Sequence, residues 1–508
     1  MGKNIFFENK RNYQRIISKT KNEYLKGNYT DSIYYAKFGA NYAWFHYPGL
    51  FYSEDLENIL ISVGSFKVDN KDRINRKFPT DNRLKVMHVA SEIYDTGGHT
   101  RAILNWIGNS KTQYNNLLVL TRNTVIRPFI SSFLKRYHIT TIGLDNEKNN
   151  ILDIASNLRA IAKAWPDYII LHTHPDDVIP LLAFSDFEGP PILLFNHADH
   201  VFWLGSKISD SILNIRKEGL DLSVERRNTI NNFMLPLPLL KKERNEHKLI
   251  DKSIMRSKKI ILTIASDYKY TPLENYNFSY FFEKFLEKKI DVGLIAIGAS
   301  RTGNLSRLHK KFPNRILLIP ATSNIQQFLS VADIYVDSFP MSSLTSYLEA
   351  GIQGIPVLGV KNHIVPFLSA MDPAFESASF PIFLNSLKDL ENELEYLIDD
   401  PKEEEERGNK IREAIIKTHC GEEWFNLAKR DLKLVVNHKI ITQNQAHINR
   451  GTNYDEHLAI FLRKAMENNR PAIRLYEWAR LFSYTYLNDF IGKNIEYTGA
   501  YLSHLKNK

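Results

Sequence analysis

The sequence predicts an α/β protein with two parallel-sheet domains in series and helical extensions at both ends. Short apolar strands alternate with helices between residues 84 and 240, and the alternation starts again at residue 258. This pattern is typical of parallel sheets with helices on both faces. The length of 508 residues fits two large domains with smaller additions. The predicted parts are the N-terminal extension 1–78, the first domain 79–250, the second domain 251–436 and the C-terminal extension 437–508.

The composition indicates a folded protein, since 43% of the residues are hydrophobic and 12% are aromatic. Cys420 is the single cysteine, which excludes an internal disulfide and a cysteine-based zinc site. No apolar run reaches the ~18–20 residues that span a bilayer. The N-terminal stretch MGKNIFFENKRNYQR lacks the apolar core of a signal peptide. We therefore expect a cytoplasmic protein, and peripheral association with the inner face of the membrane stays open.

The net charge of +9 comes from 66 basic and 57 acidic residues that are spread along the chain. Nucleic-acid binding uses a clustered basic patch with interleaved aromatic residues, and the sequence has no such patch. No nucleic-acid partner is therefore expected. An anionic substrate, a membrane surface and an ordinary soluble surface each explain the basic excess.

The N-terminal extension is predicted to be helical. Residues 1–75 carry apolar side chains at helical spacing, interrupted by Pro48-Gly49. Ser53-Glu54-Asp55 then has the composition of a new helix start. The polar segment 67–82 is the expected linker to the first domain.

The first domain opens with the predicted strand Leu84–Ala90, followed by a tight turn at Gly97-Gly98. His99 and Arg101 begin the next helix. Glycines at such a turn let backbone N–H groups approach a ligand, so Gly98 is a candidate ligand contact. Two glycines instead of the three of the dinucleotide fingerprint argue against a nicotinamide cofactor. His99 is either a ligand contact or a helix-start histidine that faces solvent.

Strands and helices continue to alternate. Helices are predicted at 126–137 and 151–164, and strands at 117–120, 139–143, 168–171 and 192–195. The last two strands run into the sequences HTHPDD (172–177) and NHADH (196–200). Ligands of parallel sheets bind beyond the carboxyl ends of the strands, where these clusters and residues 97–101 lie. His197 and Asp199 are candidates for sugar contacts or catalysis. A metal site and a structural role are the alternatives for these histidines and aspartates.

The second domain begins with a predicted strand at 259–265, after a connection at 241–257 that is rich in Lys, Glu and Arg. Lys269 follows the carboxyl end of this strand. It is placed to meet a diphosphate as a point charge, or it is a surface lysine. A strand at 292–297 leads to a loop with Arg301, and a strand at 316–319 leads to Pro320-Ala321-Thr322.

The stretch 333–358 predicts a strand, a loop, a helix and another strand. Ser342, Ser343 and Thr345 lie at the helix start, where unpaired N–H groups and a partial positive charge suit a phosphate. Glu349 lies about one turn further, where a carboxylate can bind the two hydroxyls of a ribose. An ordinary βαβ unit with a surface glutamate has the same spacing.

Helices are predicted at 386–399, 401–418 and 421–436, and residues 440–508 add further amphipathic helices. The basic and aromatic residues of these last helices suit a membrane surface or a partner. Packing against the rest of the protein is the role that we expect for them.

Two βα domains in series, the Gly-Gly turn, Lys269 and the stretch VADIYVDSFPMSSLTSYLEAGIQGIPVL together resemble a GT-B glycosyltransferase. The resemblance covers residues 84–435. The quoted stretch is similar to the donor-binding block of family-4 glycosyltransferases and of the O-GlcNAc transferase family. The resemblance implies two Rossmann-like domains that face each other across a cleft and use a nucleotide sugar, such as a UDP-sugar, as substrate.

The resemblance also implies roles for individual residues. Glu349 would bind the donor ribose, Ser343 and Thr345 the diphosphate, and Lys269 the leaving diphosphate. The implied donor-binding residues are Gly98, Lys269, Arg301, Ala321, Thr322, Ser342, Ser343, Thr345 and Glu349. On the acceptor side, the candidate catalytic bases are His99, His197 and Asp199.

Two features depart from the family pattern. Family-4 enzymes commonly carry two glutamates eight positions apart, but the residue eight positions before Glu349 is Met341. Tyr268-Lys269 also lacks the usual Arg-x4-Lys pair, unless Arg301 supplies the second charge. Retention and inversion of the sugar configuration therefore both stay open.

The expected function is metal-independent transfer of a hexosyl or N-acetylhexosaminyl group from a nucleotide sugar to a glycan, lipid-linked or protein acceptor. No cofactor is expected besides the nucleotide-sugar substrate. The alternatives are a nucleotide-sugar epimerase or a glycan phosphorylase on the same fold, and a non-catalytic GT-B protein that binds glycans.

Overall fold

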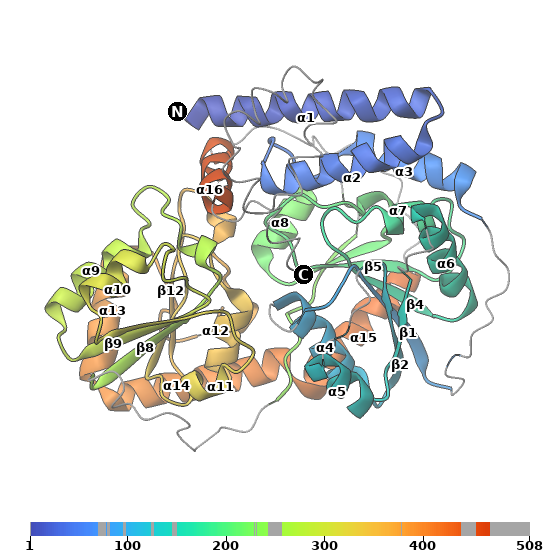
Figure 1. Cartoon of the computed structure of the whole chain (residues 1–508). Coiled ribbons are helices and arrows are strands. Elements are labelled where there is room, and N and C mark those ends of the chain that lie inside the picture. Colours follow the sequence, from blue (N-terminus) through green and yellow to red (C-terminus); the bar gives the residue numbers. More distant parts are fainter. Residues whose placement is uncertain are drawn as a thin grey trace.

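The computed structural model describes residues 2–69, 78, 82–94, 98–122, 126, 128–144, 150–227, 229, 231–241, 257–376, 378–437 and 454–467. These residues form two α/β domains that stand side by side, each around a parallel sheet (Figure 1). Helices from the N-terminal extension lie along one side of the first domain. The predicted two-domain α/β fold is confirmed.

The first domain contains a seven-stranded parallel sheet in the order β3-β2-β1-β4-β5-β6-β7. Its strands are β1 Leu84–Ala90, β2 Tyr114–Leu120, β3 Thr140–Gly143, β4 Tyr168–His172, β5 Ile192–Asn196, β6 Ser211–Asn214 and β7 Asn232–Met234. Val86 and Met87 of β1 belong to two different apolar layers, because successive side chains point to opposite faces of a sheet. Burial on both faces explains the near-continuous apolar runs of these strands.

The second domain contains a six-stranded parallel sheet in the order β10-β9-β8-β11-β12-β13. Its strands are β8 Lys259–Ile264, β9 Val292–Ile297, β10 Ile316–Ile319, β11 Ile334–Val336, β12 Val357–Val360 and β13 Phe383–Leu384. In both sheets the first strand of the domain lies inside the sheet, and the strand order changes direction beside it.

Helices follow most of these strands. In the first domain they are α4 Gly98–Ser110, α5 Pro128–Arg136, α6 Ile151–Ala164, α7 Ile179–Ala183 and α8 Lys217–Arg226. In the second domain they are α9 Phe278–Lys288, α10 Ser306–Lys311, α11 Gln326–Leu329 and α12 Leu344–Gly351. Short 3-10 helices also shape the loops: η1 Ser206–Ile208, η3 Asp267–Tyr270, η4 Pro366–Leu368 and η5 Pro373–Phe375.

The N-terminal extension folds into α1 Gly2–Leu25, α2 Tyr29–Phe45 and α3 Glu54–Lys67. Ser53 caps α3 by accepting a hydrogen bond from the backbone N–H of Leu56. The buried carboxylate of Glu57 accepts hydrogen bonds from the backbone N–H groups of Gly205, Ser206 and Lys207. Since these three residues belong to the first domain, the extension is fixed to that domain.

Gly64 of α3 packs directly against α7, and we expect Gly64→Ala to destabilise this contact. An added Cβ would lie 2.5 Å from the carbonyl oxygen of Leu182 and 2.5 Å from Ser185 Oγ. Overpacking of this kind costs about 1–3 kcal/mol. The urea concentration at the midpoint of unfolding should therefore fall in Gly64→Ala and stay unchanged in Ser65→Ala, whose side chain is exposed. Equal midpoints for the two variants would contradict this packing.

The helices at the end of the second domain cross back to the first. The helices α13 Leu387–Asp399 and α14 Pro401–His419 contact the second domain, whereas α15 Gly421–Asn437 packs against α4 of the first domain. The Trp424 ring lies 5.2 Å from the Trp106 ring, and Trp424 Nε1 donates a hydrogen bond to the carbonyl of Pro236. Thus α15 lies within the range predicted for the second domain, 251–436, but packs against the first.

His419 lies where the chain crosses back. Its Nδ1 is 2.7 Å from the carbonyl oxygen of Leu237, and its Nε2 is 2.7 Å from Oδ1 of Asp372. A carbonyl and a carboxylate only accept hydrogen bonds, so both ring nitrogens of His419 carry protons and the imidazole is cationic. Beside this pair, the backbone N–H of Leu239 donates to the carbonyl of His419. We call Leu237, Leu239, Asp372 and His419 the crossing.

An apolar group, which we call the bridging cluster, joins the extensions to both domains. Its members include Tyr47 and Phe51 from the N-terminal extension, Leu222 from the first domain, Met341 and Phe367 from the second domain, and Phe461 from α16 Asp455–Glu467. The Tyr47 hydroxyl donates a 2.7 Å hydrogen bond to Asp455. The described helix of the C-terminal extension therefore packs against the rest of the protein, as expected. Residues 438–453 and 468–508 lie outside the described residues.

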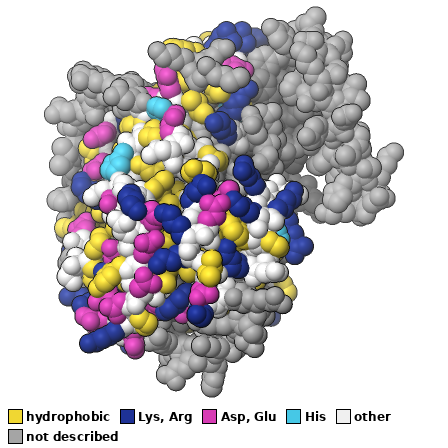
Figure 2. Space-filling view, turned by 90° about the vertical axis from the view of Figure 1, so that its left-hand side faces the viewer, with side chains coloured by type: hydrophobic (Ala, Val, Ile, Leu, Met, Phe, Trp, Pro, Cys, Tyr) yellow, Lys and Arg dark blue, Asp and Glu magenta, His cyan; other side chains and the backbone are white. Residues whose placement is uncertain are grey.

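Basic and acidic side chains are mixed on the outer face of the second domain (Figure 2). Ion pairs on this domain include Lys288 with Glu391 and Lys289 with Asp399. This mixed face differs from the clustered basic surface that nucleic-acid binding requires. In the part of the chain that the structure describes, no helix combines the length and the apolar character needed to cross a membrane.

Candidate functional site

Several candidate residues of both domains lie where the strand order changes direction. This point falls between β1 and β4 in the first sheet and between β8 and β11 in the second. Ligands of parallel sheets bind outside the carboxyl ends of the strands at such points. Gly98 and His99 follow β1, Lys269 follows β8, and the start of α12 follows β11.

The two domains touch between Gly98, at the start of α4, and Thr345, in the first turn of α12. A Cβ added to Gly98 would lie 2.4 Å from Thr345 Oγ1. The missing side chain of Gly98 therefore lets the two helix starts approach each other closely. Two predicted donor residues from different domains meet in this way. Gly97, the other glycine of the predicted turn, lies outside the described residues.

Asp337, at the carboxyl end of β11, holds the start of α12. Its carboxylate accepts hydrogen bonds from the hydroxyl of Ser342 and from the backbone N–H groups of Ser338 and Ser343, the latter two at 2.9 Å. Burial raises the pKa of Asp337 to about 6, although these hydrogen bonds and Lys269 oppose the shift. Ser343 is the N-cap residue of α12 and Ser342 precedes it, so the helix begins one residue later than Ser343.

Lys269 lies on η3, and its Nζ donates a 2.7 Å hydrogen bond to the carbonyl of Ser342. Burial lowers the pKa of Lys269 to about 8, although the Asp337 carboxylate opposes this shift. The ammonium group thus lies beside the helix start that is predicted to hold a phosphate. This geometry brings Lys269, Ser342 and Ser343 together.

Glu349 projects from the second turn of α12, and its carboxylate forms an ion pair with Arg101 of α4. The Glu349 side chain is 7% exposed and the Arg101 side chain 25% exposed. The pair therefore joins the two domains next to the contact between Gly98 and Thr345. Glu349, the residue that is predicted to bind the ribose, therefore already has a cationic partner in the first domain.

Histidines from three strand ends gather in the first domain. The ring of His99 lies 4.5 Å from the ring of His197 and 5.5 Å from the ring of His174. His99 Nε2 lies 2.6 Å from the carbonyl oxygen of His172, and His197 Nδ1 lies 3.2 Å from that of Phe195. Because a carbonyl only accepts, these ring nitrogens carry the protons and the opposite nitrogens keep lone pairs.

Burial favours the neutral form of the gathered histidines. Burial lowers the pKa of His99 well below its usual value, and the charges of His197 and His174 would lower it further. Burial also lowers the pKa of His197 to about 4. Nδ1 of His99 is buried and has no hydrogen-bond partner among the described residues. This unprotonated nitrogen is a free proton acceptor.

Asp199 is engaged by Arg216, which follows β6. Arg216 donates to both carboxylate oxygens of Asp199, with Nη2 2.8 Å from Oδ1. Despite burial, this ion pair and the hydrogen bond from His200 lower the pKa of Asp199. Arg216 also donates to the backbone carbonyls of Phe367 and Ser369 in the second domain. Asp199 therefore holds a contact between the domains and is a poor proton acceptor in this arrangement.

The remaining predicted donor residues lie further out. Arg301 and Ala321 are exposed and Thr322 is partly buried, on the loops after β9 and β10. Thr322 Oγ1 accepts a hydrogen bond from the N–H of Asn324. In the described part of the chain no contact joins Arg301 to Lys269. The structure thus does not bring Arg301 to the position of a second charge beside Lys269.

The structure explains why Met341 stands at the position of the first glutamate of the family pattern. Its side chain is 4% exposed and belongs to the bridging cluster, together with Tyr47, Phe51 and Phe461. A glutamate here would place a charge among apolar side chains without a partner, which is unfavourable. The apolar contact with the extensions accounts for the missing first glutamate of the family pattern.

Two cations of the site, Arg101 and Arg216, were not among the predicted site residues. Arg216 lies two residues after the end of β6, so its position at the carboxyl end of a strand was a usable signal. Arg101 belongs to the turn sequence GGHTR. Its partner Glu349 is 248 positions away, and such a distance in sequence hides the pairing.

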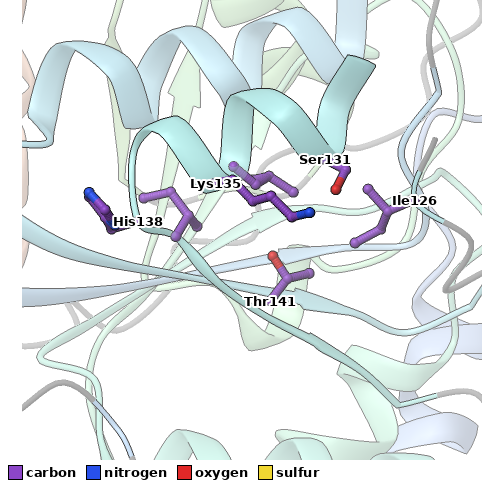
Figure 3. A pocket seen from close by; sticks show the side chains of 7 residues that line it. Ile126, Ser131, Lys135, His138 and Thr141 are labelled. Carbon is purple, nitrogen blue, oxygen red and sulfur yellow. The ribbon is translucent and has the colours of Figure 1, made fainter. Parts of the chain in front are cut away.

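Among the described residues, no group of three or more His, Cys, Asp and Glu side chains is arranged to hold a metal ion. A surface hollow of about 350 Å³ lies between α5 and β3, where Ser131, Lys135 and Thr141 line it (Figure 3). None of its lining residues is a predicted site residue. This hollow is therefore separate from the candidate site.

The sequence matches no family model and no curated protein. Solved structures do resemble this one. A glycosyltransferase from Rickettsia africae ESF-5 has 14% identity and a TM-score of 0.53, covering 71% of this chain and 100% of that one. A mutant of S. aureus TarM, in complex with fondaparinux, α-GlcNAc-glycerol and UDP, has 11% identity and a TM-score of 0.54, covering 69% and 99%. Anabaena HepE, in complex with UDP and glucose, has 12% identity and a TM-score of 0.51, covering 70% and 100%.

Sequence identities of 11–14% support a conclusion about the fold alone. The structure has two parallel-sheet domains that contact each other between α4 and α12, and it resembles these solved structures. Both observations define its fold class. The chain has the GT-B fold, as the sequence predicted.

Proposed function

We propose that this protein is a glycosyltransferase that moves a sugar from a nucleotide-sugar donor, such as a UDP-sugar, to an acceptor hydroxyl or amide. The acceptor is a glycan, a lipid-linked molecule or a protein. The observation that carries the proposal is the meeting of Lys269, the start of α12 and Glu349 with Gly98 and Arg101 of the facing domain. The UDP complexes of TarM and HepE, which share the fold, support a nucleotide-sugar donor.

The donor occupies the second domain in this proposal. Lys269 and the start of α12, with Ser342, Ser343 and Thr345, bind the diphosphate. Glu349 binds the ribose hydroxyls. The base lies toward Ala321 and Thr322, with Arg301 at the rim, because their loops lie at the same edge of the sheet. The nucleotide sugar is the substrate, and no resident cofactor or metal takes part.

The chemistry breaks the bond between the anomeric carbon and the diphosphate oxygen and forms a bond from that carbon to the acceptor. The diphosphate leaves with the bonding electrons, and Lys269 with the N–H groups of α12 stabilises the added charge. The acceptor proton goes to an imidazole nitrogen, Nδ1 of His99 or Nε2 of His197, if the configuration is inverted. A bound diphosphate raises the pKa of these histidines and makes them better bases. Asp199 positions Arg216 between the domains.

A donor screen tests this proposal. The wild-type protein is incubated with UDP-, GDP-, ADP-, CMP- and dTDP-sugars, and nucleotide release and binding are measured. We expect one nucleotide class to bind and Glu349→Gln to raise its dissociation constant about 10- to 100-fold, since a hydrogen bond to a charged group contributes about 1.5–3 kcal/mol.

Glu405→Gln on the exposed face of α14 is the matched control and should bind like the wild type. If no nucleotide sugar binds the wild type, the transferase proposal is wrong. If the donor sugar is converted without any acceptor, the protein is an epimerase instead.

A further inference from the structure

The ion pair between Arg101 and Glu349 is the starting point for an inference that rests on the proposed function. It connects α4 of the first domain with α12 of the second. Glu349 is almost fully buried, whereas Arg101 keeps a quarter of its side chain exposed. The guanidinium therefore reaches a buried carboxylate from the side of the domain interface that remains accessible.

A ribose at Glu349 and a guanidinium at Glu349 are in competition. The two ribose hydroxyls donate to the carboxylate oxygens, and the Arg101 N–H groups donate to the same carboxylate. Because the Glu349 carboxylate is almost fully buried, it has little room for a ribose and a guanidinium together, and donor binding would release Arg101. A cation released from a buried carboxylate needs a new anionic partner, because an unpaired charge at an interface is unfavourable.

The donor diphosphate is the nearest anion that the proposed function supplies. Arg101 lies one turn after Gly98, and Gly98 lies against Thr345 at the start of α12. The guanidinium is therefore a neighbour of the helix start where the diphosphate binds. Arg301, the expected second cation, is exposed and makes no described contact with Lys269.

We propose that Arg101 is a ligand of the donor diphosphate, supplied by the first domain. In the free protein it neutralises Glu349. On donor binding the ribose takes over Glu349, and Arg101 binds the phosphate oxygens opposite Lys269. A guanidinium suits this role, because it donates two parallel hydrogen bonds to a phosphate and stays charged.

The test compares the affinities for UDP and uridine by calorimetry, in EDTA and without added metal. If the screen selects another base, the matching diphosphate and nucleoside are used. In the wild type, UDP should bind more tightly than uridine. In Arg101→Gln this preference should fall about tenfold or more, because one charge-assisted contact with phosphate is lost. Uridine itself should bind as well as before or better, because Glu349 no longer has to release a guanidinium.

Two further variants complete the test. Arg101→Lys keeps the charge and should restore part of the preference for UDP. Arg307→Gln, whose side chain is 84% exposed on α10, should leave both affinities unchanged. A lost structural contact would weaken UDP and uridine equally, so an unchanged ratio in Arg101→Gln and Arg101→Lys overturns the proposal. If UDP and the other nucleoside diphosphates fail to bind even the wild type, the proposed function itself fails.

Discussion

Lys269→Ala is expected to lower the turnover number for sugar transfer by about 10²- to 10³-fold, the loss that follows removal of one preorganised donor to a developing charge. Lys269 Nζ lies 2.7 Å from the carbonyl of Ser342, beside the start of α12, where the leaving diphosphate gains charge in the proposed function. The measurement is the initial rate of nucleotide release at saturating donor and acceptor. Since removal of this charge acts on the leaving group, turnover should fall more than donor affinity.

The pH dependence of the wild type gives an independent check on Lys269. Burial lowers the pKa of this ammonium group to about 8. Deprotonation above that pH removes the positive charge, so kcat/KM should fall as the pH rises through about 8. In Lys269→Arg the group stays charged, and this alkaline decline should disappear.

Lys258 offers the matched control for both measurements. It precedes the same strand, β8, but its side chain is 82% exposed and pairs with Asp291. Lys258→Ala should transfer sugar at the wild-type rate. Equal turnover in Lys269→Ala and Lys258→Ala would show that Lys269 does not act on the leaving group.

The second large effect concerns the crossing. His419→Gln is expected to lower the free energy of unfolding by about 3–5 kcal/mol, because it leaves the buried carboxylate of Asp372 without its cationic partner. Both side chains of this pair are fully buried, so solvent cannot replace the lost contact. The midpoint of urea unfolding, followed by the fluorescence of the tryptophans at α4 and α15, measures the loss.

The same pair predicts how stability changes with pH. Burial lowers the pKa of His419, but the Asp372 carboxylate and the hydrogen bonds to Asp372 and Leu237 outweigh burial and raise it above its usual value. A raised pKa in the folded state contributes stability that is fully present below the unfolded pKa of about 6.5. This contribution is lost as the pH rises through the folded pKa. The advantage of the wild type over His419→Gln should therefore shrink toward alkaline pH.

His309 is the control for the crossing. Its ring also contacts a carbonyl, that of Ile316, but has no described contact with a carboxylate. His309→Gln should keep the pH dependence of the wild type. If His419→Gln also keeps that dependence, the cationic state of His419 is refuted.

The sequence allowed prediction of the strands and of the sheet edge at which the candidate site lies. Apolar runs such as Leu84–Ala90 end abruptly at polar residues, and parallel strands bring their carboxyl ends to one edge. Local rules therefore sufficed to select Gly98, Lys269, Ser343 and Glu349, which the structure places around the contact between α4 and α12. The same rules gave the helices of the second domain.

Contacts between distant parts of the chain could not be predicted in this way. The Arg101–Glu349 pair and the contacts of Arg216 with Phe367 and Ser369 depend on how the two domains are placed. The packing of α15 against α4 depends on the direction in which the chain continues after α14, which no local pattern determines. Met341 was recognised as a departure from the family pattern, but its apolar partners come from both extensions.

The bridging cluster and the crossing lie at opposite ends of the interface between the domains, with α16 at one end and α14 and α15 at the other (Figure 1). The Gly98–Thr345 contact, the Arg101–Glu349 pair and the contacts of Arg216 with the second domain join the domains at further points between these two ends. Without these middle contacts, the two ends would define an axis for rotation of one domain relative to the other. Atoms close to such an axis sweep short arcs, while those far from it sweep long ones. The start of α12 and the start of α4 lie between these two ends, close to the axis. A rotation about it would change their separation less than that of residues far from the axis.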